Sequence, residues 1–220
     1  MSKRQVVISH PVRTAIGAFG GALKDVPATE LGAAAVRETL RRSGLAADQL
    51  ASVTLGNVIQ AGNKMNPARQ AALGGGVPVT VPAQTINRVC GSGAQAIASA
   101  AQEIWLGFGE VALAGGMENM DRAPFLLDNG RWGYRMGNAQ IYDSALHDGL
   151  VDAFSDEHSG WHTEDLVAQL DITREAQDRF AARSQQRFAA AQKRGAFDAE
   201  RVAVEVKGRK ETISFIRDEQ

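Results

Sequence analysis

Cysteine is nearly absent from this chain of 220 residues, which contains one such residue, at position 90. A single cysteine cannot form a disulfide within the chain. The amino-terminal residues MSKRQVVISHPVRTAIG also lack the apolar core and the cleavage site of a secretory signal. We therefore expect a reducing, cytoplasmic setting for the protein.

Long apolar runs and an excess of either charge are missing as well. No apolar run approaches the roughly 20 residues that a membrane-spanning helix needs. Lys and Arg together number 24 against 25 Asp and Glu, so the net charge gives no general attraction to nucleic acid or to an anionic membrane. We expect no nucleic acid and no membrane among the partners.

What the chain does contain, up to about residue 120, is an alternation of β-like and helix-like segments, which favours an α/β layer architecture. The β-like segments are 6–8, 53–59, 83–87 and 111–114, and the helix-like segments are 29–42, 67–73 and 94–105. The last of these helices is apolar nearly all round. This pattern predicts that it is buried on several sides, between layers.

Beyond residue 120 the pattern becomes irregular, and turn residues with scattered aromatic side chains indicate a long insertion. Regular helix returns after Thr173, which is expected to cap it. Two β-like segments follow, at 201–206 and 213–216. We therefore expect a first domain over residues 1–120, which carries the cysteine, and a second over residues 121–220.

The single cysteine lies between a β-like segment and the start of a helix, in the stretch NRVCGSG at 87–93. Unpaired backbone N–H groups and the positive end of the helix dipole stabilise a thiolate there, so Cys90 is a candidate nucleophile. Gly91 and Gly93 leave room for a substrate to approach. The alternative is a small buried side chain that fills a gap, because no histidine neighbours Cys90 to act as its base.

Two further motifs compete with this interpretation. Residues 91–96 (GSGAQA) fit the dinucleotide fingerprint. That fingerprint requires an acidic residue at the end of the next strand, whereas Glu110 lies just before the β-like segment 111–114. His158 and His162 are four positions apart among acidic residues, yet the segment between them lacks the glutamate of the zinc motif and contains Gly160. We assign no metal to the chain and keep dinucleotide binding as a weaker alternative.

Four segments, in one order, resemble the amino-terminal portion of the thiolases, the group of acetyl-CoA acetyltransferase and 3-ketoacyl-CoA thiolase. They are PVRTAIGAFGGALKD at 11–25, GNVIQAGNKMNPARQAAL at 56–73, NRVCGSGAQAI at 87–97 and AGGMENMDRAPF at 114–125. The resemblance extends along essentially the whole chain. It implies a thiolase-like layered α/β domain with an inserted, partly irregular lid domain that helps to hold coenzyme A.

The resemblance also implies a reaction. Cys90 would accept an acyl group from an acyl-CoA and pass it to a second acyl-CoA in a Claisen condensation, or to coenzyme A in the reverse cleavage. Coenzyme A then enters as part of the substrate, and no tightly bound cofactor is implied. His158 and Leu150 match positions that contact coenzyme A, and Ser159 stands where many members have methionine, which opens the site to a bulkier or more polar acyl group.

Thiolases are longer than this chain, and their second half supplies a histidine in a G-H-P motif and a cysteine in a C-x-G-G-G motif, neither of which occurs here. The resemblance therefore implies a complementary carboxyl-terminal half as partner. Residues 131–150 resemble a segment associated with tetramer contacts, so we expect a homo-oligomer, either a dimer or a tetramer. The alternative function is a non-catalytic subunit that binds acyl-CoA or serves assembly.

Overall fold

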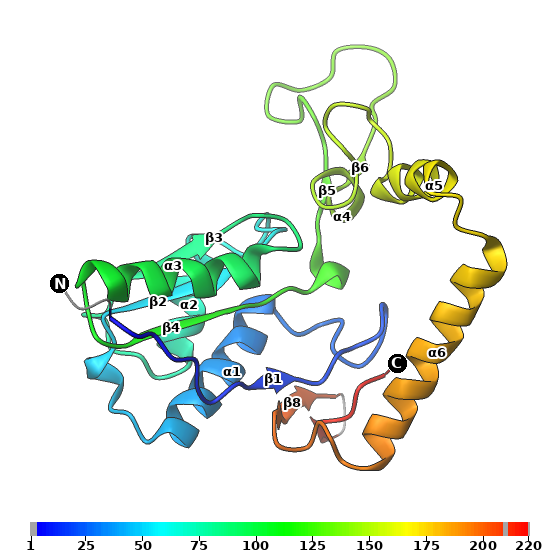
Figure 1. Ribbon diagram of the computed structural model, residues 1–220. Coiled ribbons are helices and arrows are strands. Elements are labelled where there is room, and N and C mark those ends of the chain that lie inside the picture. Colours follow the sequence, from blue (N-terminus) through cyan, green and yellow to red (C-terminus); the bar gives the residue numbers. More distant parts are fainter. Residues whose placement is uncertain (1–3, 209–210, 220) are drawn as a thin grey trace.

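The computed structural model, which describes residues 4–208 and 211–219, contains a three-stranded parallel sheet between two layers of helices (Figure 1). The strands of this sheet are β2 (Ser52–Gly56), β3 (Ala83–Ile86) and β4 (Ala112–Gly116), in the order β3-β2-β4. Parallel strands require crossover connections. These contain α2 (Pro67–Gly74), between β2 and β3, and α3 (Ser92–Leu106), between β3 and β4. The expected α/β architecture is confirmed.

The two faces of the sheet are covered by different helices (Figure 1). On one face, α1 (Ala28–Ser43) and α2 pack together, and their apolar side chains meet Val53 and Leu55 of β2 in the main core. Gly32 lets these helices approach closely, because a Cβ atom there would lie 3.0 Å from the Cβ atom of Ala71. The other face carries α3, which packs against β2 and β4.

Local sequence signals set the ends of several helices. Gly44 ends α1 with a φ of 65°, the left-handed conformation that glycine adopts readily at this position. Pro67 occupies the first turn of α2, where its missing N–H group costs nothing. Thr173 accepts a hydrogen bond from the N–H group of Ala176 and caps α6 (Arg174–Lys193), as predicted.

The helix that follows the cysteine is covered on one side only. Ala96 and Ala100 of α3 are buried, whereas the side chains of Ile97 and Trp105 are 39% and 51% exposed. The expectation of burial on several sides is therefore wrong for the described part of the chain. The apolar composition of α3 exceeds what one sheet can cover, so part of the helix faces solvent.

The strand expected at residues 6–8 does not form. Val7 and Ile8 are 84% and 74% exposed, and the segment belongs to no strand. A short apolar run becomes a strand only where a neighbouring backbone pairs with it. The chain is instead held just before this segment, where the indole N–H group of Trp105 donates to the carbonyl of Arg4 at 3.1 Å.

Two segments that are far apart in the sequence, residues 13–16 and the described residues of 201–219, meet beside α1 (Figure 1). β1 (Arg13–Thr14) pairs in parallel with β7 (Arg201–Val202), and β8 (Val204–Lys207) pairs antiparallel with β9 (Thr212–Phe215). Ala15, Leu31 and Phe215 belong to a second apolar core at this point. The β-like segments expected after residue 200 are therefore present, and they pack against the segment near residue 15.

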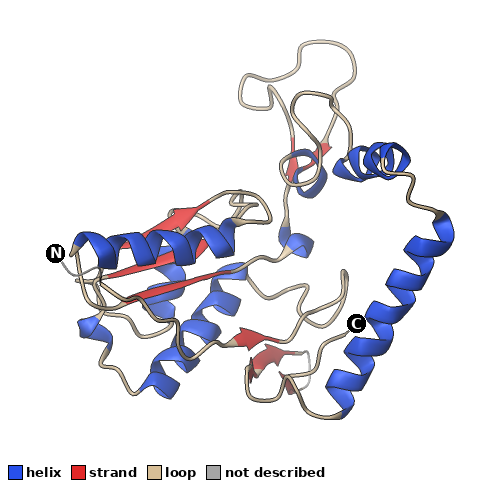
Figure 2. Cartoon of the chain, viewed as in Figure 1, coloured by secondary structure: helices blue, strands red, loops and turns tan. Residues whose placement is uncertain are grey.

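An insertion lies between the sheet region and β7, and its loops occupy the top of Figure 2. Its elements are β5 (Phe125–Leu126), β6 (Tyr142–Asp143), α4 (Ser144–His147), α5 (Ser159–Gln169) and α6. Residues 127–141 are all exposed, and α5 buries no residue. Short 3₁₀ helices are η1 (Ala47–Gln49) and η2 (Met120–Arg122). No helix in the described ranges is long and apolar enough to cross a membrane.

Candidate active site

Cys90 lies in the short connection between β3 and α3, directly before Gly91, the N-cap residue of α3. The residue before it, Val89, has a φ of 47°, in the left-handed region that β-branched residues avoid. Ligand sites of open α/β sheets lie at the carboxyl ends of the strands. Cys90, which is exposed, follows the carboxyl end of β3 and so lies at this edge.

Two glycines on neighbouring strands let the start of α3 approach the sheet. Gly56 of β2 is the register partner of Gly116 of β4. A Cβ atom on Gly56 would lie 2.6 Å from the Cβ atom of Ser92, and one on Gly116 would lie 3.6 Å from the Cα atom of Gly93. The first turn of α3 therefore rests on the strand backbone, and a larger residue at position 56 would displace the helix start behind Cys90.

A cavity of about 480 Å³ opens beside Cys90. Its apolar lining residues are Val12, Ile16, Leu31, Ala35, Val58, Ile59, Val89, Met117, Met120 and Leu150. They come from the amino-terminal segment, α1, the loops after β2, β3 and β4, and the insertion. Binding sites of about 300–1,000 Å³ with mainly apolar walls are typical for small organic ligands. The cavity thus suits an uncharged, flexible group next to the thiol.

Glu118, two residues after β4, lines the same cavity and fixes the neighbouring loop. Its carboxylate accepts hydrogen bonds from the backbone N–H group of Val58 at 2.7 Å and from Nδ2 of Asn57 at 2.8 Å. Asn57 is 1% exposed and also donates to the carbonyl of Met117. Sequence reasoning missed both Asn57 and Glu118. Their position directly behind parallel strands was the signal that could have indicated them.

The three residues assigned to the substrate site, His158 and Leu150 for coenzyme A and Ser159 for the acyl group, lie together, but only Leu150 lines the cavity. Leu150 contributes to its wall. The backbone N–H group of Ser159 donates to the carbonyl of Leu150 at 2.9 Å, and His158 pairs with Val151 in a single β-bridge. The side chains of His158 and Ser159 are exposed and stand outside the lining of the cavity.

His158 also caps α5. Its Nδ1 atom accepts a hydrogen bond from the backbone N–H group of Gly160 at 3.0 Å, so in this arrangement Nδ1 carries no proton and Nε2 is the donor. His162, the other member of the metal hypothesis, contacts the hydroxyl of Ser155 through Nε2 at 2.9 Å. Within the described residues, no group of three or more His, Cys, Asp or Glu side chains is arranged to hold a metal ion.

Among the described residues, Cys90 offers a hydrogen-bond donor, its backbone N–H group, but its thiol is hydrogen-bonded to no base. Within residues 4–208 and 211–219, neither the thiol nor the backbone N–H group of Cys90 has a hydrogen-bond partner. A free N–H group at the start of a helix can stabilise a negatively charged oxygen. A thiol without a neighbouring base reacts slowly, because the thiolate is the nucleophile. The described chain therefore holds one part of the machinery that a reacting thiol needs.

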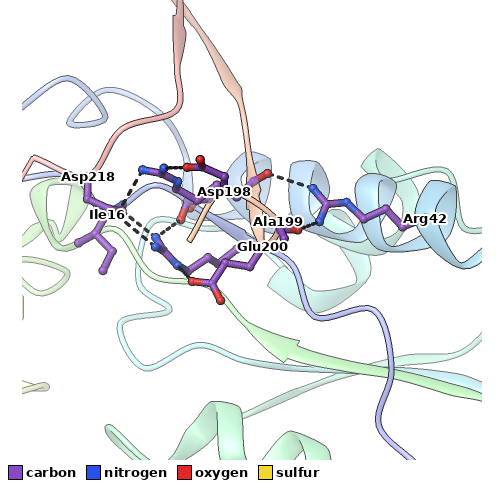
Figure 3. A network of polar contacts seen from close by, with 9 residues as sticks. Ile16, Arg42, Asp198, Ala199, Glu200 and Asp218 are labelled. Atoms are coloured by element: carbon purple, nitrogen blue, oxygen red, sulfur yellow. Dashed lines mark hydrogen bonds and ion pairs between the residues drawn. The ribbon is translucent and has the colours of Figure 1, made fainter. Parts of the chain in front are cut away.

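A network of charged side chains holds one wall of the cavity (Figure 3). Arg13 lines the cavity, but its guanidinium donates to Asp218 at 2.7 Å and to Glu200 at 2.6 Å. The side chain of Asp218 is fully buried and also accepts from the N–H group of Ile16 at 2.8 Å. The hydrogen bond from Arg13 holds the pKa of Asp218 below its ordinary value. Residues 13–16 of the cavity wall are therefore held in place by Glu200 and Asp218.

These features describe an α/β protein with a cysteine on a tight strand-to-helix turn beside an apolar cavity. The family model for the thiolase N-terminal domain matches residues 6–220. The chain therefore belongs to the thiolase family, as the four sequence segments indicated.

Two relatives support the assignment to the thiolase family. The chain is 50% identical to a probable acetyl-CoA acyltransferase of Staphylococcus epidermidis over 206 residues, which are 94% of this chain and 52% of that protein. It is 48% identical to a probable acetyl-CoA acyltransferase of Staphylococcus aureus over 216 residues, 98% of this chain and 55% of that protein. The chain thus spans about half the length of these relatives.

A solved structure agrees in fold. The crystal structure of the Bacillus anthracis acetyl-CoA acetyltransferase superimposes with a TM-score of 0.91 at 42% sequence identity. The match covers 94% of this chain and 52% of that protein. The layered α/β fold of a thiolase amino-terminal domain is therefore confirmed, and the chain spans about half the length of that structure.

Proposed function

We propose that this chain is the amino-terminal part of a thiolase-type acyl-CoA C-acyltransferase in which Cys90 accepts the acyl group. The observation that carries the proposal is the position of the one thiol of the chain, on a tight turn beside an apolar cavity of about 480 Å³. The names of the relatives, acetyl-CoA acyltransferase and acetyl-CoA acetyltransferase, support acyl-CoA as the class of substrate.

The proposed reaction begins at the thioester. The thiolate of Cys90 attacks the carbonyl carbon, the bond from that carbon to the sulfur of coenzyme A breaks, and coenzyme A leaves as a thiolate. The unpaired backbone N–H group of Cys90 stabilises the negative charge that develops on the carbonyl oxygen. In the condensation, a second acyl-CoA loses a proton from its α-carbon to a base of the complementary half, and this carbon attacks the acyl carbon. The bond from the acyl carbon to the sulfur of Cys90 then breaks, and a 3-ketoacyl-CoA is released. In the reverse direction, the thiolate of coenzyme A takes the acyl group from Cys90. Coenzyme A is part of the substrate, and the proposal requires no tightly bound cofactor.

Residues 121–220 act in this proposal mainly as a lid domain over coenzyme A, beside a first domain over 1–120. Leu150 supplies an apolar contact at the cavity wall. Nε2 of His158, which is left as a donor while Nδ1 caps α5, donates to the pantetheine arm. Ser159 follows on the same segment and leaves more room for the acyl group than a methionine does.

A complementary half completes the site in this proposal. It supplies the histidine and the second cysteine that the resemblance implies, and it covers the exposed side of α3, where Ile97 and Trp105 face solvent. We further propose that the assembled protein is a homo-oligomer, a dimer or a tetramer. Gel filtration of this chain tests the need for cover, since a well-folded, monodisperse monomer of 23.4 kDa would contradict it.

Intact-mass measurement after incubation with acetyl-CoA tests the role of Cys90. The chain is incubated alone and with the second half of the Staphylococcus aureus relative supplied as a separate chain. We expect one acetyl group per chain, absent in Cys90→Ser, and faster formation when the second half is present because that half brings the base. A parent protein that stays unmodified in both arms, while still binding acetyl-CoA, supports the non-catalytic acyl-CoA-binding alternative instead.

A further inference from the structure

The turn that carries Cys90 is held in a conformation that its own residues disfavour. Val89 has a φ of 47°, and its β-branched side chain makes this left-handed conformation costly. Such a backbone conformation persists only where surrounding contacts hold it in place. The contacts around Val89 therefore decide the direction in which the neighbouring thiol points.

Ser92 makes contacts on both sides of Val89. Its hydroxyl donates to the carbonyl of Val89 at 2.6 Å and accepts from the backbone N–H group of Arg88 at 2.8 Å. The backbone N–H group of Ser92 donates to the same Val89 carbonyl at 3.0 Å. One side chain thus closes the turn around the residue with positive φ.

Burial makes the bonds of Ser92 difficult to replace. Ser92 is 4% exposed, so water has little access to substitute for its hydroxyl. A Cβ atom on Gly56 would come within 2.6 Å of the Cβ atom of Ser92, so the serine cannot move toward the sheet. Asn87 also accepts from the N–H group of Val89, at 3.0 Å, but its side chain is exposed and water competes for that bond.

We infer that Ser92 is a positioning residue whose hydroxyl holds Val89 in the left-handed conformation and thereby directs the Cys90 thiol into the apolar cavity. The inference rests on the proposed function, because the direction of the thiol matters to catalysis only where Cys90 accepts an acyl group. It extends that function to a side chain that acts on the turn and not on the reacting atoms.

The test compares two reactions of the single cysteine. Acetylation by acetyl-CoA requires a thiol directed into the cavity, whereas alkylation by iodoacetamide requires only an accessible thiol. Ser92→Ala is expected to slow acetylation about tenfold, the kinetic equivalent of one lost hydrogen bond, and to change alkylation less than about threefold. Ser99→Ala is the matched control, since it removes a hydroxyl of the same helix that accepts from Gln95 and makes no contact with the turn among the described residues. It is expected to leave both rates unchanged.

Rescue at position 89 separates positioning from general damage to the fold. In a Ser92→Ala background, Val89→Gly removes the penalty for positive φ, and acetylation is expected to return to within about threefold of the parent rate. Val89→Ala in the same background is expected to give no rescue, because alanine keeps the penalty. A Ser92→Ala protein that acetylates at the parent rate, or whose defect Val89→Gly leaves unchanged, overturns the inference.

Amide hydrogen exchange keeps this inference distinct from the proposed function. The N–H group of Gly91 donates to the carbonyl of Arg88 at 3.1 Å across the turn, so its exchange rate reports the turn without any acyl-CoA. Ser92→Ala is expected to raise this rate, and Ser99→Ala is not. A parent protein that is never acetylated refutes the proposed function, whereas unchanged Gly91 exchange in Ser92→Ala refutes the role of Ser92.

Discussion

Helices α1 and α5 of the same chain differ in what holds them, since α1 buries five residues and α5 buries none. α1 packs against α2 in the main core. In the insertion, α5 begins at the cap of His158, and α6 has the cap of Thr173 and an exposed ion pair between Arg174 and Asp178. Caps contribute about 1 kcal/mol each and exposed ion pairs less, whereas core side chains contribute several times more. Most of the stability of the chain therefore belongs to the sheet region.

The largest expected effect follows from truncating the same residue type in both regions. Leu55 of β2 is 3% exposed and Leu166 of α5 is 52% exposed. Leu55→Ala should lower the free energy of unfolding by about 2–5 kcal/mol, and Leu166→Ala by less than about 1 kcal/mol, because only the first leaves a cavity. Urea denaturation followed by circular dichroism measures both values. Equal losses would show that α5 is packed as firmly as the sheet.

The next largest expected effect is the loss of unfolding free energy when a buried ion pair is broken, compared with the loss for an exposed one. Asp218→Asn weakens the pairing of Arg13, whose side chain is 29% exposed, and should cost about 2–3 kcal/mol, below the range for a fully buried pair. Asp178→Asn removes the exposed partner of Arg174 and should cost less than about 0.5 kcal/mol. The measurement is again the free energy of unfolding in urea. The comparison fails if the two variants lose similar amounts.

The stability that Asp218 contributes should depend on pH. Its pKa in the folded protein is lowered from 3.8, chiefly by the hydrogen bond from Arg13. Its contribution to stability is therefore complete above its unfolded pKa and is lost as the pH falls through the lower folded value. Between about pH 5 and about pH 2 the parent protein should lose more stability than Asp218→Asn does. Parallel losses in the two proteins would contradict the assignment.

A smaller and local effect is expected at the cap of α5. His158→Ala removes the acceptor of the Gly160 N–H group and should destabilise the start of α5 by about 1 kcal/mol, seen as faster amide exchange in that helix alone. His158→Asn preserves a capping acceptor and should restore the protection. Because asparagine changes the donor that His158 offers at Nε2, weak acyl-CoA binding in a protein with a restored cap would assign that donor to the ligand.

The smallest expected effect on stability is that of Ser159→Met. Ser159 is exposed at the start of α5, so the free energy of unfolding should change by less than about 0.5 kcal/mol. Under the proposed function, the longer side chain narrows the acyl site, and acetylation of Cys90 should be favoured over transfer of longer acyl groups. Competition between acetyl-CoA and butanoyl-CoA, measured by intact mass, checks this. An unchanged product ratio would remove Ser159 from the acyl site.

Local features of the fold could be predicted from the sequence, because their causes lie within a few residues. The cap at Thr173, the helix end at Gly44 and the strand-to-helix position of Cys90 all follow from short patterns. The expected strand at residues 6–8 failed, because pairing depends on a neighbouring backbone and not on apolar composition. The same limit explains α3. Its apolar composition predicts that most of its surface should be buried, but it does not show how much of that surface the rest of the chain covers.

The candidate site likewise contains residues that the sequence predicted and residues that it did not. Cys90 and Leu150 line one cavity, whereas His158 and Ser159 are not among its lining residues. Asn57 and Glu118 were not predicted, because their bond joins loops that are 61 positions apart in the sequence. No pattern within one segment shows that a carboxylate will accept from a loop so distant in the chain.

The clamp between Arg13 and Asp218 also constrains the order in which the molecule can be completed during synthesis. These residues are 205 positions apart, so the wall around Ile16 cannot be fixed until Asp218 has emerged from the ribosome. The contacts of α1 to α3 with the sheet involve residues up to about position 117 and can form earlier. A nascent chain in which β4 has left the ribosome but Asp218 has not can therefore form the sheet and place Cys90, but it cannot finish the cavity beside it.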